Sequence, residues 1–155
     1  MAWSDSHWFI AFPKDACDNT SALDLGADTH KVALFDNSIT PDRTVASAST
    51  AYGAGVWAAG GVFDATGWPA VGRNLVTPTW TQSSATATFD AVDTASANST
   101  TTLSAFFGCL VYDDTITTPV ADQGISFNYF GGSNSVTVGS ATIVWNASGI
   151  CAITT

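Results

Sequence analysis

The sequence predicts an all-β domain, either an antiparallel β-sandwich or a jelly-roll-like barrel, with one short helix and long loops. Glu is absent and basic residues are few, so the residues that favour long exposed helices are almost missing. Aromatic residues make up 12% of the chain and include six Trp, which suits a β core. From residue 73 onward, short runs of β-forming residues alternate with turn signals, the pattern of a sandwich or barrel.

The first half of the chain predicts few regular elements. The length of 155 residues fits one domain, spanning 1–155, and residues 1–27 are expected to form an irregular N-terminal arm. The apolar run Val32–Phe35, ended by Asp36, predicts a strand over 31–35. Residues 44–52 predict one or two turns of helix, and 53–72 should be mostly loop.

The second half predicts a succession of strands. The first covers 73–81, and Pro78 makes it an edge strand or a bulged one. A second covers 85–92, and the long apolar run 106–112 fits a central strand buried on both faces. Residues 124–132 alternate as a strand, and the last two strands are expected to form a hairpin around the turn at 146–149.

The charge balance excludes several classes of partner. The net charge is −9, and the only cations are Lys14, Lys31, Arg43 and Arg73, so nucleic acid and anionic membranes are not expected partners. No apolar run is long enough for a transmembrane helix, and the N-terminus lacks the pattern of a signal peptide, which predicts synthesis in a cytoplasm. Only 11% of residues are charged, which indicates that partners cover part of the surface.

The residues that usually carry catalysis or bind metals form no recognisable constellation. His7 and His30 belong to no cluster, and Asp113 and Asp114 are adjacent, so on a strand they point to opposite faces. We therefore expect no enzymatic activity, no cofactor and no metal. The three cysteines are not a disulfide framework. They are interpreted as thiols, two of them buried, with a Cys109–Cys151 disulfide as the alternative.

Clustered aromatic and apolar residues are the strongest candidates for a functional site. The N-terminal cluster must pack on its own domain or on a neighbouring subunit, and the surplus of aromatic residues elsewhere favours the neighbour. Two tryptophans in a Gly-rich loop are interpreted as core or interface residues, or alternatively as a sugar-stacking platform beside Asp64. The predicted assembly interface comprises Trp3, Trp8, Phe9, Ile10, Phe12, Trp57 and Trp68.

An ordered set of short motifs covers most of the chain. It begins with an Asp-Thr-x-Lys-Val-Ala-Leu opening over 28–34 and continues to an Ile-x-Trp-x-x-x-Gly-Ile ending over 143–150. The elements between them are a turn over 37–41, Ala51-Tyr52-Gly53, Gly60-Gly61, Gly72-Arg73-Asn74-Leu75, Val111-Tyr112-Asp113 and Phe130-Gly131-Gly132. This order resembles a group of small structural proteins of tailed bacteriophages.

The resemblance implies a non-enzymatic component of a virion. Members of the group are capsid decoration or minor tail proteins, so the implied partners are the phage major capsid protein or tail proteins, together with further copies of the chain as a homo-oligomer. A decoration protein would lie on the outer surface of the particle, after synthesis in the host bacterial cytoplasm, and would stabilise the capsid lattice. A minor tail protein, or a carbohydrate- or receptor-binding module, is the alternative. The aromatic N-terminus lies outside the shared pattern.

Overall fold

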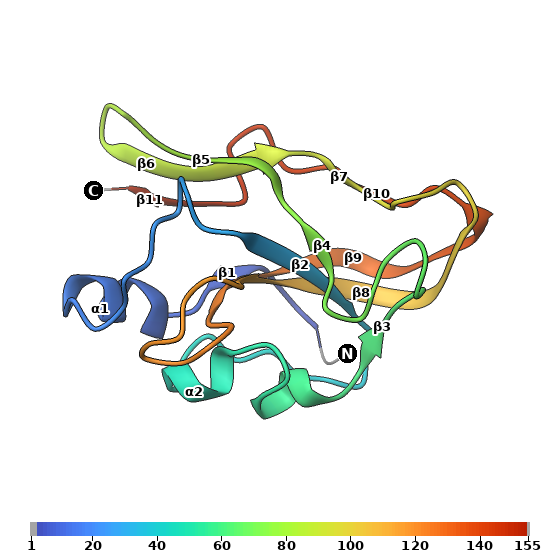
Figure 1. The fold of residues 1–155 in the computed structure, drawn as a ribbon, viewed down its shortest axis with the longest axis horizontal. Coiled ribbons are helices and arrows are strands. Elements are labelled where there is room, and N and C mark those ends of the chain that lie inside the picture. The colour runs from blue at the N-terminus through green and yellow to red at the C-terminus, as the bar shows by residue number, and fades with distance from the viewer. Residues whose placement is uncertain (1–2, 155) are drawn as a thin grey trace.

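The chain folds into packed antiparallel β-sheets, with short helices on the outer face of the larger sheet (Figure 1). The computed structural model describes residues 3–154. Strands hold 43% of the chain and helices 10%, which confirms the predicted all-β class and sandwich architecture. The elements are β1 (His7–Trp8), α1 (Ala11–Cys17), β2 (His30–Phe35), α2 (Ser47–Thr50), the 3₁₀ helix η1 (Gly55–Ala58), β3 (Gly61–Val62), β4 (Arg73–Asn74), β5 (Val76–Ser83), β6 (Thr86–Val92), β7 (Thr94–Ala95), β8 (Thr101–Asp113), β9 (Gly124–Gly139), β10 (Thr142–Ile143) and β11 (Cys151–Thr154).

The larger sheet is built around the strands with the longest apolar runs. Its order is β1-β9-β8-β2-β3, and β4 also pairs with β2. β8 lies between β2 and β9, and residues 108–113 of β8 are buried, which confirms the predicted central strand. Such burial requires cover on both faces, because neighbouring side chains of a strand point in opposite directions.

The smaller sheet has three strands in the order β11-β6-β5. β5 is an edge strand, and its pairing with β6 shifts register between Val76 and Thr79. Pro78 lies within this shift, so both features that Pro78 predicted are present. A separate two-stranded ribbon of β7 and β10 joins the sheets at the other end of the molecule (Figure 1).

Apolar side chains fill both faces of the larger sheet. On the side of the helices, Phe35 and Phe127 pack against Trp57, with the Phe35 and Trp57 rings 5.0 Å apart. On the opposite side, His30 of β2 meets Phe89 of β6 edge to face, with ring centroids 5.2 Å apart. The core is therefore divided into two layers by β2, β8 and β9.

Two sequence predictions about pairing are wrong. The predicted arm over 1–27 is not irregular in its described part, residues 3–27, because this part contains β1, which pairs with β9, and the helix α1. The last two strands do not form a hairpin, because β10 pairs with β7 and β11 with β6. The turn over 146–149 exists, with the Gly149 N–H donating to the Asn146 carbonyl at 2.8 Å, but it carries the chain from the β7–β10 ribbon to the smaller sheet.

All three cysteines are free thiols, so the alternative of a Cys109–Cys151 disulfide is wrong. Burial raises the pKa of both Cys109 and Cys151 to about 12. Both thiols therefore remain protonated at neutral pH and behave as small apolar side chains. Cys17, at the end of α1, is exposed.

Candidate functional site

Three of the five N-terminal apolar side chains lie inside the domain's own core. Trp3 and Phe9 are fully buried and Phe12 almost so. The Trp3 ring lies over Gly108 of β8, where a Cβ would approach to 2.5 Å, and its Nε1 donates to the Asp36 carbonyl at 2.7 Å. The prediction that these residues contact a neighbouring subunit is therefore wrong for Trp3, Phe9 and Phe12.

Trp57 and Trp68 are also buried, so neither a subunit contact nor a sugar-stacking platform exists at these residues. Trp57 lies within the aromatic cluster on the helix side of the larger sheet, against Phe9 and Phe35. Trp68 lies on the opposite side and donates its Nε1–H to the Val32 carbonyl at 3.2 Å. Most of their Gly-rich loop is exposed, but both indole rings point into the core.

Asp64, the acidic residue of that proposed platform, organises the loop instead. Its carboxylate accepts hydrogen bonds from the backbone N–H groups of Thr102, Thr66 and Gly67 and from the Thr66 hydroxyl, at 2.8–3.0 Å. These donors favour the ionised form and hold the pKa of Asp64 well below its ordinary value. The carboxylate ties the loop to the start of β8.

The lowered pKa of Asp64 predicts an acid-sensitive contribution to stability. A group whose pKa is lower in the folded state stabilises the fold above its unfolded pKa of about 3.9 and loses that contribution as the pH falls toward the folded value. We expect Asp64→Asn to be less stable than the wild type at pH 7 and to lose less stability between pH 5 and pH 2. Urea unfolding followed by circular dichroism across this range measures both effects.

Asp122 provides a control of opposite sign. Burial and the nearby Asp114 raise its pKa, so its ionised form opposes folding at neutral pH. Asp122→Asn should therefore gain stability at pH 7. If the wild type and Asp64→Asn lost the same free energy of unfolding between pH 5 and pH 2, the role assigned to Asp64 would be contradicted.

A buried histidine–aspartate pair lies where the two sheets meet. His30 Nε2 is 3.4 Å from Asp113 Oδ2, and both side chains are fully buried. The other oxygen, Oδ1, accepts from the backbone N–H groups of Thr115 and Ile116, so Asp113 begins the loop after β8. Burial acts in the opposite direction, but His30 and these N–H groups hold the pKa of Asp113 below its ordinary value.

The geometry of this pair is structural. Solvent reaches neither side chain, and a reacting group would need to approach one of them. Within residues 3–154, no group of three or more His, Cys or Asp side chains is placed to hold a metal ion. No helix in the same part of the chain is long and apolar enough to cross a membrane.

Trp8 and Ile10 are the predicted interface residues that remain at the surface. Ile10 is 53% exposed, and Trp8 is half-buried. The Trp8 ring meets the Trp80 ring of β5 edge to face at 6.1 Å, and its Nε1 donates to the Ala152 carbonyl of β11 at 3.2 Å. Trp8 thereby joins the N-terminal segment to the smaller sheet.

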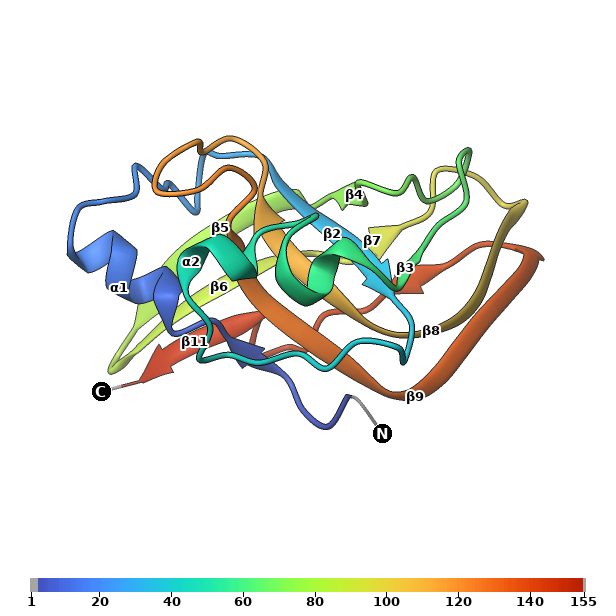
Figure 2. The same cartoon turned by 90° about the horizontal axis from the view of Figure 1, so that it is seen from below.

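Around Trp8, side chains from α1, its two flanking segments and the smaller sheet form a continuous apolar surface. Trp80 is 39% exposed and Ile153 41%. Figure 2 shows α1 and β11 at the same end of the molecule, where this surface lies. We call it the Trp8 surface, and it comprises Trp8, Ile10, Pro13, Leu23, Trp80 and Ile153.

Two adjoining cavities make the Trp8 surface concave. One, of about 630 Å³, lies between α1, the segment after it and the smaller sheet. The other, of about 460 Å³, lies between the N-terminal segment and β11. Trp8, Pro13 and Ile153 line both cavities. The first cavity is also lined by one charged residue, Asp24, and the second by Arg43.

Sequence reasoning missed Trp80 and Ile153. Trp80 lies on β5, which the sequence did identify as an edge or bulged strand, and an aromatic residue on an exposed edge is a signal for an interaction surface. Ile153 gave no such signal, because the predicted hairpin assigned its strand to the wrong partner. Comparisons with protein-family models, curated proteins and solved structures found no match.

Proposed function

We propose that the protein is a structural component of a tailed-phage virion, a capsid decoration protein that binds the major capsid lattice through the Trp8 surface. The observation that carries the proposal is the Trp8 surface itself. It presents two adjoining concavities lined by apolar side chains on a chain with few charges. Contiguous exposed apolar surface of this kind marks protein–protein contacts.

The geometry suits an extended segment of a partner. Burial of apolar surface contributes roughly 25 cal/mol per Å² removed from water, so filling both cavities provides a substantial driving force. β11 is an edge strand of the smaller sheet and borders the second cavity. An edge strand can accept another strand by backbone hydrogen bonds while the neighbouring cavities receive its side chains.

Three of the motifs behind the resemblance, the opening over 28–34, Gly72–Leu75 and Val111–Asp113, lie next to one another in the larger sheet. Arg73 of β4 pairs with Val32 of β2, which in turn pairs with Val111 of β8. Tyr112 stacks on Tyr52 with ring centroids 5.0 Å apart. These segments specify the framework of the fold, which is the part that a group of related virion proteins would share. The Trp8 surface lies outside them and would determine where this protein binds.

The test is whether Ile10→Asp abolishes binding to the particle. Ile10 is half exposed, so the substitution should leave the fold intact while placing an unpaired charge in the contact. We expect the affinity for capsids that lack the protein to fall at least about tenfold, a loss of about 1.4 kcal/mol. Co-sedimentation with purified particles measures the bound fraction.

Val56→Asp is the matched control. Val56 is exposed on η1, away from the Trp8 surface, and the substitution adds the same charge. We expect this variant to bind as the wild type does. Equal binding by Ile10→Asp and wild type would contradict the proposed contact, and binding of wild-type protein to isolated tails but not to capsids would favour a minor tail protein.

A further inference from the structure

One buried carboxylate oxygen at the end of β8 has no hydrogen-bond donor. Asp113 Oδ1 accepts two backbone N–H groups, but among the described residues Oδ2 has no hydrogen bond and only the 3.4 Å contact with His30 Nε2. A buried acceptor without a donor costs free energy. A donor that reached Asp113 Oδ2 would therefore stabilise the fold.

Asp28 is the neighbouring group that can donate a proton to this oxygen. Thr29 holds it there, because the Thr29 carbonyl accepts the Asp114 N–H and the Thr29 N–H donates to Thr115 Oγ1, both at 2.8 Å. The Asp28 carboxyl is half-buried and within hydrogen-bonding reach of Asp113. Burial and the charge of Asp113 raise the pKa of Asp28. Its exposed part gives solvent protons access to the pair.

The charged groups around these two carboxyls are mostly negative. β2 contributes His30 and Lys31, and Lys31 pairs with Asp114 at 2.7 Å. The loop after β8 also contributes Asp122, whose pKa is raised by burial and by Asp114. β6 contributes the uncharged ring of Phe89, which packs on His30. Because negative charge exceeds positive charge here, the surroundings favour the uptake of a proton.

Asp28 belongs to a segment that shapes the Trp8 surface. The segment over 18–29 joins α1 to β2, and its residues 22–26 form one wall of the first cavity. Asp24 Oδ1 accepts two backbone N–H groups of the following turn, and Asp28 Oδ2 accepts the Asp24 N–H at 2.7 Å, so these bonds stay inside the segment. Leu25 attaches the segment to the core by burial, and the Asp28 carboxyl attaches it to β8.

We infer that Asp28 and Asp113 bind one proton between them in mildly acidic solution, and that this proton fixes the wall of the Trp8 surface. At neutral pH both carboxylates are ionised and repel one another, which loosens the segment over 18–29. On acidification an O–H···O⁻ hydrogen bond, which is among the stronger hydrogen bonds in proteins, replaces the repulsion. The Trp8 surface is then better formed and holds its partner more firmly.

The raised pKa of Asp28 gives the direction of the effect. A group of this kind contributes stability that is complete below its unfolded pKa of about 3.9 and is lost as the pH rises through the folded value. Only the identity of what the wall contacts rests on the proposed function. The proton site is tested on the free protein, without particles, so its failure is separable from a failure of capsid binding.

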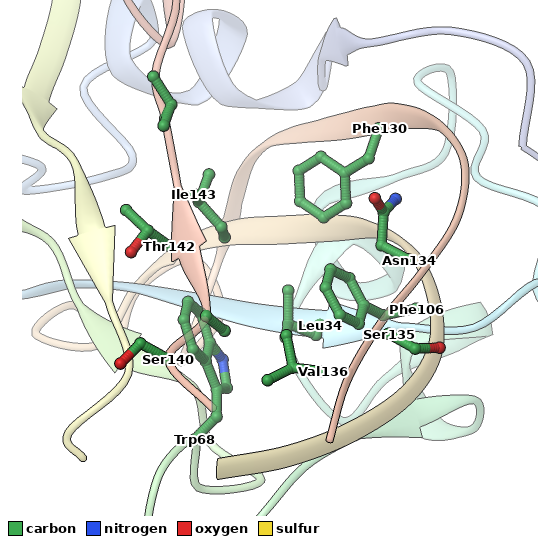
Figure 3. A pocket seen from close by; sticks show the side chains of 12 residues that line it. Leu34, Trp68, Phe106, Phe130, Asn134, Ser135, Val136, Ser140, Thr142 and Ile143 are labelled. Atoms are coloured by element: carbon green, nitrogen blue, oxygen red, sulfur yellow. The ribbon is translucent and has the colours of Figure 1, made fainter. Parts of the chain in front are cut away.

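Hydrogen exchange of the whole chain at pH 7 and pH 4.5, followed by mass spectrometry, measures how firmly the wall is held. After correction for intrinsic exchange rates, the wild type should protect residues 18–29 severalfold more at pH 4.5. The cavity of about 360 Å³ beside β9 and β10 provides an internal reference, because none of the twelve residues that line it is titratable (Figure 3). The β9 and β10 amides there should be protected equally at both pH values.

Asp28→Asn imitates the protonated state, because its amide can donate to Asp113 Oδ2 and its carbonyl can still accept the Asp24 N–H. This variant should protect the segment at both pH values as strongly as the wild type does at pH 4.5. Asp18→Asn is the matched control. It removes the same charge from the same segment, at an exposed residue that pairs with Lys14, and should keep the wild-type pH dependence.

Three results would overturn the inference. The first is equal protection of the wild-type segment at both pH values. The second is a pH dependence that survives in Asp28→Asn, which would assign the proton to His30. The third is loss of the pH dependence in Asp18→Asn, which would indicate a general effect of charge.

The wild type alone provides a second measurement if Asp28→Asn does not fold. In a carboxyl ¹³C NMR titration, Asp28 should titrate at a higher pH than Asp42, because hydrogen bonds from Thr44 lower the pKa of Asp42. The reverse order would show that Asp28 and Asp113 do not share a proton.

Discussion

Trp3→Ala is expected to lower the free energy of unfolding by about 3–5 kcal/mol, the usual cost of truncating a buried Trp. The Trp3 ring is fully buried between Trp57, Phe127 and Tyr129, with ring centroids 5.9–6.5 Å away. Its indole N–H is also bonded to the Asp36 carbonyl, which would lose its partner. Domains have only about 5–15 kcal/mol of stability, so the loss would be a large part of the total. Urea unfolding followed by circular dichroism avoids the change in tryptophan fluorescence.

Ile10→Ala is the matched control for this experiment. Ile10 belongs to the same N-terminal segment but is exposed, so its truncation should cost less than about 1 kcal/mol. A Trp3→Ala protein that fails to fold is the extreme form of the expected result. Trp3→Ala with wild-type stability would show that the N-terminal segment does not contribute to the core.

Gly72→Ala is also expected to be damaging, with a loss above about 4 kcal/mol, a size that is exceptional for a single substitution. A Cβ at this position would lie 2.2 Å from the carbonyl oxygen of Val32 and 2.5 Å from its carbonyl carbon. Both atoms belong to the backbone of β2, in the middle of the larger sheet, so neither can move without disturbing its pairing with β8. The yield of soluble protein and its thermal unfolding measure the effect.

Gly131→Ala separates this clash from backbone strain. Gly131 has a φ of +80°, close to the +85° of Gly72, but no atom lies within 4 Å of its ideal Cβ position. Its substitution should therefore cost only the conformational strain of about 1–2 kcal/mol. If Gly72→Ala and Gly131→Ala lost similar free energies of unfolding, the clash with the backbone of β2 would not contribute to the loss at Gly72.

Local sequence patterns were sufficient to find the long strands but not the short ones β1 and β7, nor the pairing of the last strands. The apolar run Val32–Phe35 and the run 106–112 are strands because β-branched and aromatic residues bounded by turns leave few alternatives. Pro78 predicted an edge or bulged strand because proline cannot donate a ladder hydrogen bond. This prediction needs no knowledge of any other residue. The pairing of β10 and β11 depends on distant segments, so the short turn between them gave the wrong answer.

Only part of the candidate site could be predicted, again because local sequence does not show which distant segments meet. A cluster of aromatic residues near a terminus must be covered by something, but its sequence does not say whether the cover is the same domain or another. Trp3 packs against Gly108 of β8, and Phe9 packs against Gly124 of β9. The absence of a side chain at each glycine leaves room for the ring. Trp8 and Ile10 lie on the other side of the same segment and were left outside, beside Trp80, which only the fold brings near.

The pairing of β1 with β9 has a consequence for synthesis on the ribosome. Trp8 pairs with Ser126, and at 5–20 residues per second the ribosome needs roughly 6–24 s to advance from one to the other. Throughout that interval the nascent chain has Trp3, Phe9 and Phe12 but not the strand that covers them. The N-terminal segment is thus without its native cover for most of translation, and the domain closes only after β9 has been synthesised.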